Sequence, residues 1–135
     1  MIFRFVVQHL RWLAGVPGLP QLFDSLLLIG TMLFNRRRLA AMETLEKAVL
    51  ELPGVTLKVH RLGGMEFIHE GTELGHLHGN GLLDVRVGRE QARALVETGR
   101  ALPHHVFGDS AWLSFWLREP KDVPSALDLL KRALR

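Results

Sequence analysis

The sequence predicts an α+β fold in which an antiparallel β-meander carries helices on one face and follows an N-terminal apolar helical hairpin. Three observations predict it: an apolar first segment, helical spacing of apolar residues at both ends of the remaining chain, and short strand-like runs divided by glycine turns between them. With 135 residues, the chain can build one sizeable core. We therefore expect an apolar helical segment over residues 1–37 and one α+β domain over residues 38–135.

The first 37 residues combine apolar stretches with a turn. The apolar stretches cover residues 2–13 and 22–34 and flank a Gly- and Pro-rich turn at residues 15–20. Neither stretch reaches the about 20 residues that a membrane-spanning helix needs. We interpret the segment as two short helices that pack on the domain or on a second copy of the chain, which would form a homodimer.

The charge of this segment supports an alternative interpretation. Residues 1–38 carry five arginines against one aspartate, whereas residues 39–135 carry twelve basic and thirteen acidic residues. An apolar and basic hairpin suits an anionic lipid surface, with Arg36, Arg37 and Arg38 at the headgroups. We expect a cytoplasmic protein, either free or peripheral to the membrane. The near-neutral body argues against nucleic acid as a partner.

The remaining elements follow from hydrophobic periodicity and turn residues. Residues 38–51 show apolar positions at helical spacing and end at Leu52-Pro53-Gly54. Four short strands follow and form the meander, a second helix ends at Gly99, and two further strands precede a closing amphipathic helix. The expected strands are residues 55–62, 65–69, 72–78, 82–87, 104–107 and 112–117, and the expected helices are residues 89–98 and 122 to the end.

Strand alternation places chemically active side chains on one face of the sheet, because successive side chains point to opposite faces. The helix-covered face is expected to hold Leu57, Val59, Leu77, Leu83, Val85, Val87, Leu113, Phe115 and Leu117. The opposite face then gathers Lys58, His60, His76, His78, Asp84, Arg86, Trp112, Ser114 and Trp116. We interpret this set as the lining of a pocket; the alternative is a half-buried face whose polar groups satisfy one another.

Several kinds of chemistry are excluded by composition. The chain has no Cys and no Tyr, which leaves histidine as the group that titrates near neutral pH. It also lacks a nucleophile elbow, a P-loop and a dinucleotide-binding fingerprint. Glu66, Glu70 and Glu73 are interpreted as solvated charges of strands and turns.

The sharpest local motif is His76-x-His78. Its two side chains point the same way on a strand and could chelate a metal, with His60, His104, His105 or Asp84 completing the site. Two histidines at this spacing are a weak metal signal, so we expect a histidine pair used for hydrogen bonding or proton transfer, with no metal and no cofactor. His104 and His105 are placed at the mouth of the same face, and a turn-stabilising role is an alternative for one of them.

Four spaced segments together resemble the domain of fungal luciferase, which small bacterial proteins of no known activity share. These segments are Glu73–Gly81, Gly99–Val106, Trp112–Leu117 and the charged turn that leads into the closing helix. The resemblance covers approximately residues 55–135, and His76, His78, His104 and Trp112 match its pattern. The chain departs from the fungal enzymes in lacking their long insertions and in having a shorter approach loop at residues 111–114.

The resemblance implies a luciferase-like oxidoreductase of the monooxygenase type that adds dioxygen to an enolisable aromatic or hydroxypyrone molecule without a cofactor. In that interpretation His76 or His78 is the base and the other donates a hydrogen bond to the developing oxyanion, while Arg86 or His104 stabilises charge. The remaining substrate-binding candidates are His60, Asp84, Trp112 and Trp116, the indoles stacking on a planar ring. A non-catalytic small-molecule or partner-binding module is the alternative. A weaker likeness in layout is to small double-wing proteins, for which nucleic-acid contact has been suggested.

Overall fold

The computed structural model describes residues 12, 15–61 and 63–134. The first half of the predicted hairpin therefore lies outside the described residues. The helices are α2 (Leu19–Phe34), α3 (Arg36–Leu50), α4 (Arg89–Glu97), the short 3₁₀ helix η2 (Pro120–Asp122) and α5 (Val123–Ala133). The strands are β1 (Val55–Val59), β2 (Met65–His69), β3 (Thr72–Leu77), β4 (Leu82–Arg86), β5 (Leu102–His104) and β6 (Gly108–Trp116).

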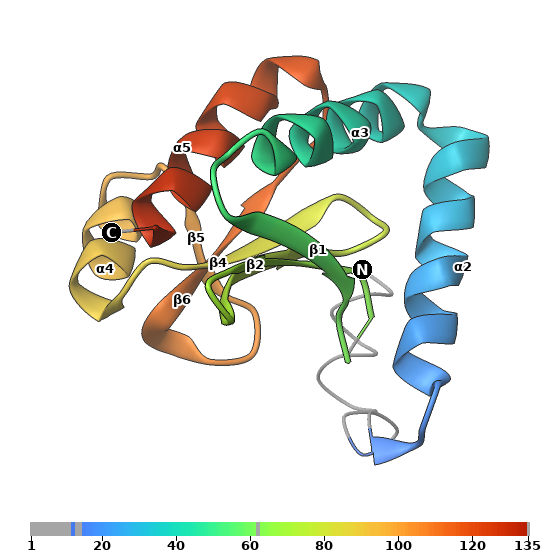
Figure 1. Ribbon diagram of the computed structural model, residues 1–135, viewed down its shortest axis with the longest axis horizontal. Helices are drawn as coiled ribbons and strands as arrows, with labels where there is room; N and C mark the ends of the chain where they lie inside the picture. Colours follow the sequence, from blue (N-terminus) through green and yellow to red (C-terminus); the bar gives the residue numbers. More distant parts are fainter. Residues whose placement is uncertain (1–11, 13–14, 62, 135) are drawn as a thin grey trace.

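All six strands form one antiparallel sheet in the order β1-β2-β3-β4-β6-β5 (Figure 1). The first four strands are the predicted meander, and β6 returns beside β4. The predicted α+β class with an antiparallel sheet is therefore confirmed. The strand expected at 104–107 differs, because backbone N–H groups of Val106 and Phe107 both donate to Nδ1 of His104 and hold residues 105–107 in a turn.

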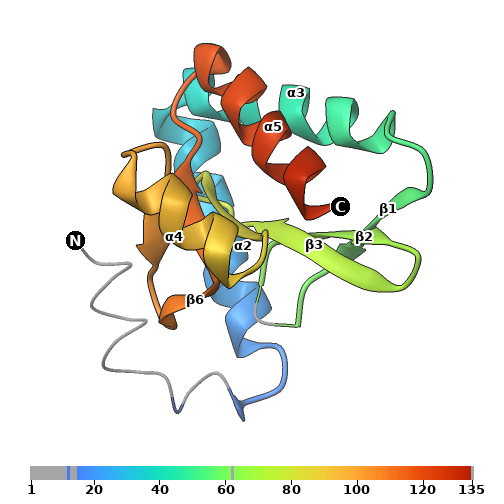
Figure 2. The same ribbon diagram turned by 90° about the vertical axis from the view of Figure 1, so that its left-hand side faces the viewer.

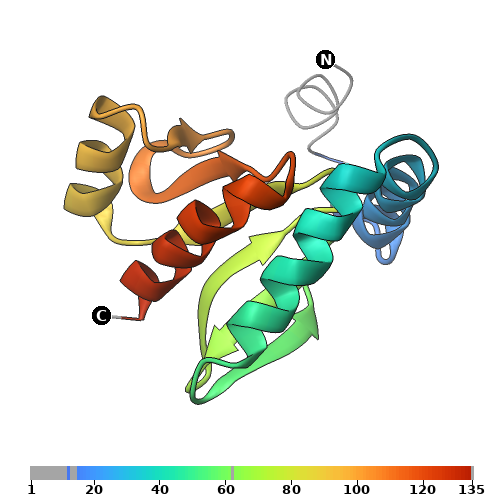
Figure 3. The ribbon, with the colours of Figure 1, turned by 90° about the horizontal axis from the view of Figure 1, so that it is seen from above.

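The hydrophobic core lies between one face of the sheet and the helices α3 and α5, which run side by side above it (Figures 2 and 3). Its fully enclosed side chains include Leu45 of α3, Phe67 of β2, Leu83 of β4 and Leu130 of α5. Val59, which alternation places on this face, is 60% exposed at the end of the edge strand β1. Because α3 and α5 cover only one face, the opposite face is left for polar side chains.

Helix α2 docks against the turn between β3 and β4. The Thr31 hydroxyl donates to the Gly79 carbonyl at 2.7 Å, and the Gly79 N–H donates to Oδ1 of Asp24 at 2.8 Å. Gly79 permits this close approach, because a Cβ at that position would lie 2.5 Å from the Asp24 carbonyl oxygen and 2.6 Å from the Leu28 nitrogen. The absence of a side chain at Gly79 therefore allows α2 to pack directly against the turn between β3 and β4.

The other face of α2 is exposed and apolar. Leu22, Leu26, Ile29 and Leu33 recur at helical spacing, and each is at least 49% exposed. Among the described residues, no helix combines the length and the apolarity that a membrane crossing requires. Contact of this segment with lipid or with a second copy of the chain stays a prediction.

Two glycine substitutions in and beside α2 should have opposite effects on stability. Gly79→Ala forces α2 away from the sheet and should lower the free energy of unfolding by about 1–3 kcal/mol. Gly30 lies within α2, and a Cβ at that position would meet no atom within 4 Å. Gly30→Ala should therefore raise the free energy of unfolding by about 0.5–1 kcal/mol. Urea denaturation followed by circular dichroism measures both changes. Equal effects of the two substitutions would contradict the proposed docking of α2.

Candidate functional site

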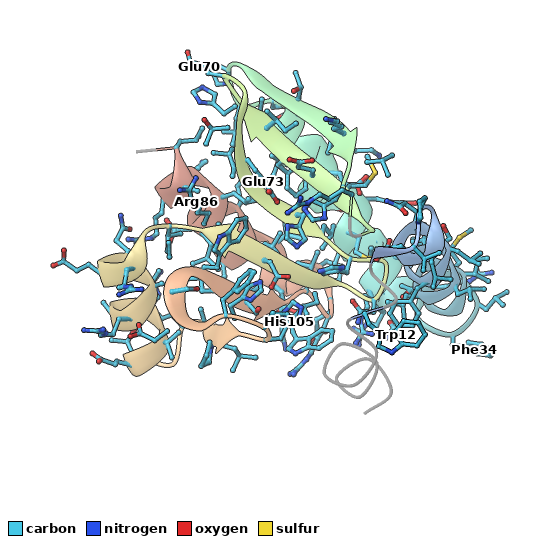
Figure 4. The ribbon with its side chains drawn as sticks, turned by 90° about the horizontal axis from the view of Figure 1, so that it is seen from below. Trp12, Phe34, Glu70, Glu73, Arg86 and His105 are labelled. Atoms are coloured by element: carbon cyan, nitrogen blue, oxygen red, sulfur yellow. The ribbon has the colours of Figure 1, made fainter. Side chains whose placement is uncertain are left out.

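The candidate site is built around Asp84, a completely buried carboxylate at the centre of the sheet. Asp84 lies on β4, on the face opposite α3 and α5, and this face is turned toward the viewer in Figure 4. His76 of β3 and Ser114 of β6 are its direct cross-strand neighbours. A carboxylate without any solvent exposure must be compensated by neighbouring donors, so these contacts define the site.

Four imidazole rings and one hydroxyl surround the two oxygens of Asp84. Oδ2 lies 3.3 Å from Nε2 of His76, 3.1 Å from Nε2 of His78 and 3.6 Å from Nε2 of His104. Oδ1 accepts a hydrogen bond from the Ser114 hydroxyl and lies 3.4 Å from Nδ1 of His105. We call Asp84 and these four histidines the histidine cluster.

A β-bulge brings Glu73 to the same face. Regular alternation places Glu73 on the helix-covered face, but the register of β2 and β3 shifts between Phe67 and Ile68 and leaves Leu74 as an extra residue. Leu74 is buried in the core, and Oε1 of Glu73 lies 2.6 Å from Nδ1 of His76. The interpretation of Glu73 as a solvated charge is therefore wrong, because the bulge turns its carboxylate toward the histidine cluster.

Helix α2 contributes a further carboxylate. Oδ1 of Asp24, which accepts the Gly79 N–H, also lies 3.5 Å from Nδ1 of His78. His76 and His78 therefore have the same arrangement, with Nε2 facing Asp84 and Nδ1 facing a second carboxylate. His60, at the end of β1, extends the site: its ring stacks on His76 at 4.0 Å, and its Nε2 lies 3.5 Å from Oε1 of Glu73.

The carboxylates favour the protonated forms of His76 and His78. Burial alone lowers the pKa of His76, but its contacts with Asp84 and Glu73 outweigh burial and raise the pKa to about 9. Burial likewise lowers the pKa of His78, and the contacts with Asp24 and Asp84 raise it above its ordinary value. Burial raises the pKa of Asp84, but contacts with His105, His76 and His78 hold this pKa well below its usual range. His76 is therefore cationic near neutral pH, and the contacts of His78 favour its cationic form.

His60 and His104 are neutral near neutral pH. Burial lowers the pKa of His60 to about 4, with repulsion from His76 as the next cause. Burial also lowers the pKa of His104 to about 4. Because Nδ1 of His104 accepts two backbone N–H groups, its single proton is on Nε2, which faces Asp84. The turn-stabilising role predicted for one of the two adjacent histidines is thus performed by His104.

The indoles and the arginine of the predicted face occupy different places. The Trp112 ring lies 5.7 Å from the ring of His76 and 6.0 Å from that of His104, so it borders the histidine cluster. The guanidinium carbon of Arg38 lies 5.9 Å from the centroid of the Trp116 ring. Trp116 also lines a surface pocket of about 270 Å³. Arg86 is exposed at the end of β4 and is the cross-strand neighbour of Trp112.

The structure thus brings most of the predicted site residues together. These are His60, His76, His78, Asp84, His104 and Trp112; their catalytic and substrate-binding roles stay predictions. Arg86 and Trp116 are on the predicted face but outside the histidine cluster. Sequence reasoning missed Glu73 and Asp24 as partners of the histidines, because one depends on a bulge and the other on the docking of a distant helix. The site is most open at Glu73 and His105, whose side chains are 24% and 16% exposed.

The comparisons with known proteins support the resemblance to luciferase. Residues 71–133 match the family model described as the luciferase domain, a span that contains Glu73, all of the histidine cluster and Trp112. The predicted luciferase-type domain is confirmed over these residues, whereas the expected similarity of residues 55–70 lies outside the match. No curated protein and no solved structure matches the chain.

The raised pKa of His76 predicts a loss of stability at alkaline pH. Because its pKa in the folded protein is about 9 and the ordinary value is 6.5, the imidazolium contributes stability in full below pH 6.5 and loses it as the pH rises through 9. The free energy of unfolding of the native chain should therefore fall over this interval relative to that of His76→Gln, in buffer with a chelator. Urea denaturation at several pH values measures the difference. Parallel pH profiles of the two proteins would contradict the ion pairs of His76.

The two hydrogen bonds to Nδ1 of His104 predict a fixed tautomer. Two-bond ¹H–¹⁵N correlation spectra at pH 7 should show His104 as a neutral ring with the proton on Nε2, because two N–H donors occupy Nδ1. His69 of β2, outside the cluster, serves as the reference ring. A protonated Nδ1 on His104 would overturn the assignment.

Proposed function

Because residues 71–133 match the family model described as the luciferase domain, we propose that the chain is an oxidoreductase that adds dioxygen to an enolisable small molecule at the histidine cluster. The observation that carries this proposal is the completely buried Asp84 with four imidazoles around it, bordered by the Trp112 ring. Such a site offers a proton acceptor, positive charge and an aromatic wall within one largely buried region. Those are the requirements for forming an electron-rich anion and protecting it from water.

We assign the role of base to His105. Its Nδ1 lies 3.4 Å from Oδ1 of Asp84, so the carboxylate is placed to orient the ring and to leave Nε2 for the substrate. Its side chain is also the most exposed of the four imidazoles around Asp84. His76 and His78, the bases suggested by the sequence, suit this role less, because contacts with carboxylates favour their protonated forms.

His76 and His78 then offset negative charge on the substrate through their positive charge, because contacts with carboxylates favour their protonated forms. Both ring nitrogens of each histidine face carboxylates, which fix the orientation of the rings. Trp112 borders both His76 and His104, so a planar substrate can pack on the indole beside these rings.

The reaction needs no external reductant. His105 removes a proton from the carbon next to the substrate carbonyl, and the resulting anion transfers electrons to dioxygen. A carbon–oxygen bond forms as the O–O π bond breaks, and the peroxide anion takes a proton to give a hydroperoxide. The substrate is oxidised by two electrons and dioxygen is reduced to the peroxide level, so atoms and electrons balance.

An oxygen-electrode assay with a hydroxypyrone tests this function. The native chain should consume dioxygen only with the substrate present, and His105→Gln should lower the rate at least about 100-fold, because it removes a general base. His76→Ala together with His78→Ala should abolish consumption. His69→Gln is the matched control, since His69 lies on β2 beside Gly54 and outside the cluster.

Circular dichroism establishes that each variant retains its fold before rates are compared. Unchanged oxygen consumption in folded His105→Gln would remove His105 as the base. Retention of the hydroxypyrone by the native chain with no product in mass spectra would instead favour a non-catalytic binding module.

A further inference from the structure

We infer that Nε2 of His76, Nε2 of His78 and Oδ2 of Asp84 form a binding site for one divalent first-row transition-metal ion. The two nitrogens lie 3.3 and 3.1 Å from Oδ2, and all three atoms lie within 4.8 Å of one another. Metal–ligand bonds of about 2.0–2.2 Å place adjacent ligands about 3.0–3.5 Å apart. Two of the three separations match this spacing, and the two Nε2 atoms lie within 4.8 Å of each other, so small side-chain adjustments on these strands would seat one ion.

The groups behind the three donors support this assignment. Nδ1 of His76 contacts Glu73 at 2.6 Å and Nδ1 of His78 contacts Asp24 at 3.5 Å, while Oδ1 of Asp84 contacts Ser114 and His105. A carboxylate on Nδ1 places the ring proton there and leaves the Nε2 lone pair for a metal, which is the arrangement found behind metal-bound histidines. Each ligand thus has a partner on its outer atom.

Two other groupings of histidines and carboxylates are excluded by their hydrogen bonds. Glu73, His60 and His76 form one of them, but the 2.6 Å contact of Glu73 with Nδ1 of His76 is a hydrogen-bond distance, too short for two ligands of one ion. Asp84, His104 and His105 form the other. Nδ1 of His104 accepts two backbone N–H groups, so Nε2 of His104 carries the proton and cannot bind a metal.

The donor set indicates the class of ion. Two imidazoles and one carboxylate suit iron, manganese, cobalt, nickel or zinc better than calcium or magnesium, which prefer oxygen ligands. Three protein ligands leave positions for water or substrate, as in non-haem iron(II) oxygenases. Nε2 of His104 lies 3.6 Å from Oδ2 of Asp84, beside the three proposed ligand atoms. The site goes beyond the proposed function and does not depend on it.

Metal titration of the untagged full chain tests the inference. The protein is treated with EDTA, freed of the chelator and titrated with Co²⁺ alone, with isothermal calorimetry and the visible Co²⁺ spectrum as readouts. We expect one equivalent of Co²⁺ to bind and to raise the melting temperature. His76→Gln, His78→Gln and Asp84→Asn should each weaken binding at least about 100-fold, and Glu73→Gln about 10–100-fold.

The control variants separate the three groupings. His60→Gln and His104→Gln should change the affinity less than tenfold, and His69→Gln should leave it unchanged. If Asp84→Asn does not fold, the double substitution of His76 and His78 by Gln replaces it. Absence of binding at 100 μM Co²⁺, or undiminished binding in this folded double variant, would overturn the site.

The same titration distinguishes failure of the site from failure of the proposed oxygenase. It uses no substrate, so bound Co²⁺ without oxygen consumption in the hydroxypyrone assay would leave the metal site in place and remove only the oxygenase. Oxygen consumption by a chain that binds no Co²⁺ would instead remove the metal site and leave the proposed oxygenase in place.

Discussion

The structure depends on one buried charge, the carboxylate of Asp84. Removing a carboxylate from water costs several kcal/mol unless donors replace the solvent. Here a hydroxyl and four imidazoles take that place, and they come from β3 and the residue after it, from β5, from the turn between β5 and β6, and from β6. The positions of the histidines therefore follow from the need to compensate the buried negative charge of Asp84 as well as from the geometry of the sheet. A rigid polar centre results on the face that α3 and α5 leave uncovered.

The outer contacts of this centre connect it to the rest of the fold. Glu73 reaches His76 through the bulge in β3, and Asp24 reaches His78 from α2. Asp24 also accepts the N–H of Gly79, so the docking of α2 and the orientation of His78 share one oxygen atom. The N-terminal segment thus takes part in the site rather than only covering it. A change in the position of α2 should therefore alter the surroundings of Asp84 through the His78 ring, which lies between Asp24 and Asp84.

Two charge states are open to the same rings. Without a metal, the contacts with carboxylates favour protons on the nitrogens of His76 and His78 that face Asp84. With a metal, the same Nε2 atoms are ligands, while Nδ1 keeps its carboxylate partner. His105 and Ser114 contact the other oxygen of Asp84, Oδ1, which is not a proposed metal ligand. The proposed base is therefore compatible with both, because it does not use the atoms that a metal would bind.

The sequence by itself determined the α+β class, most element positions and the face shared by His76, His78, Asp84 and Trp112, because period-two alternation is a local property of strands. Only the tertiary structure decided the partners of these residues. The bulge that redirects Glu73 depends on burial of Leu74 in the core, and Asp24 meets His78 across 54 positions of chain. Arg86 and Trp116 obey the alternation but lie outside the histidine cluster. Alternation along a strand determines which face of the sheet a residue occupies, whereas the distances between residues on that face depend on how the whole molecule packs.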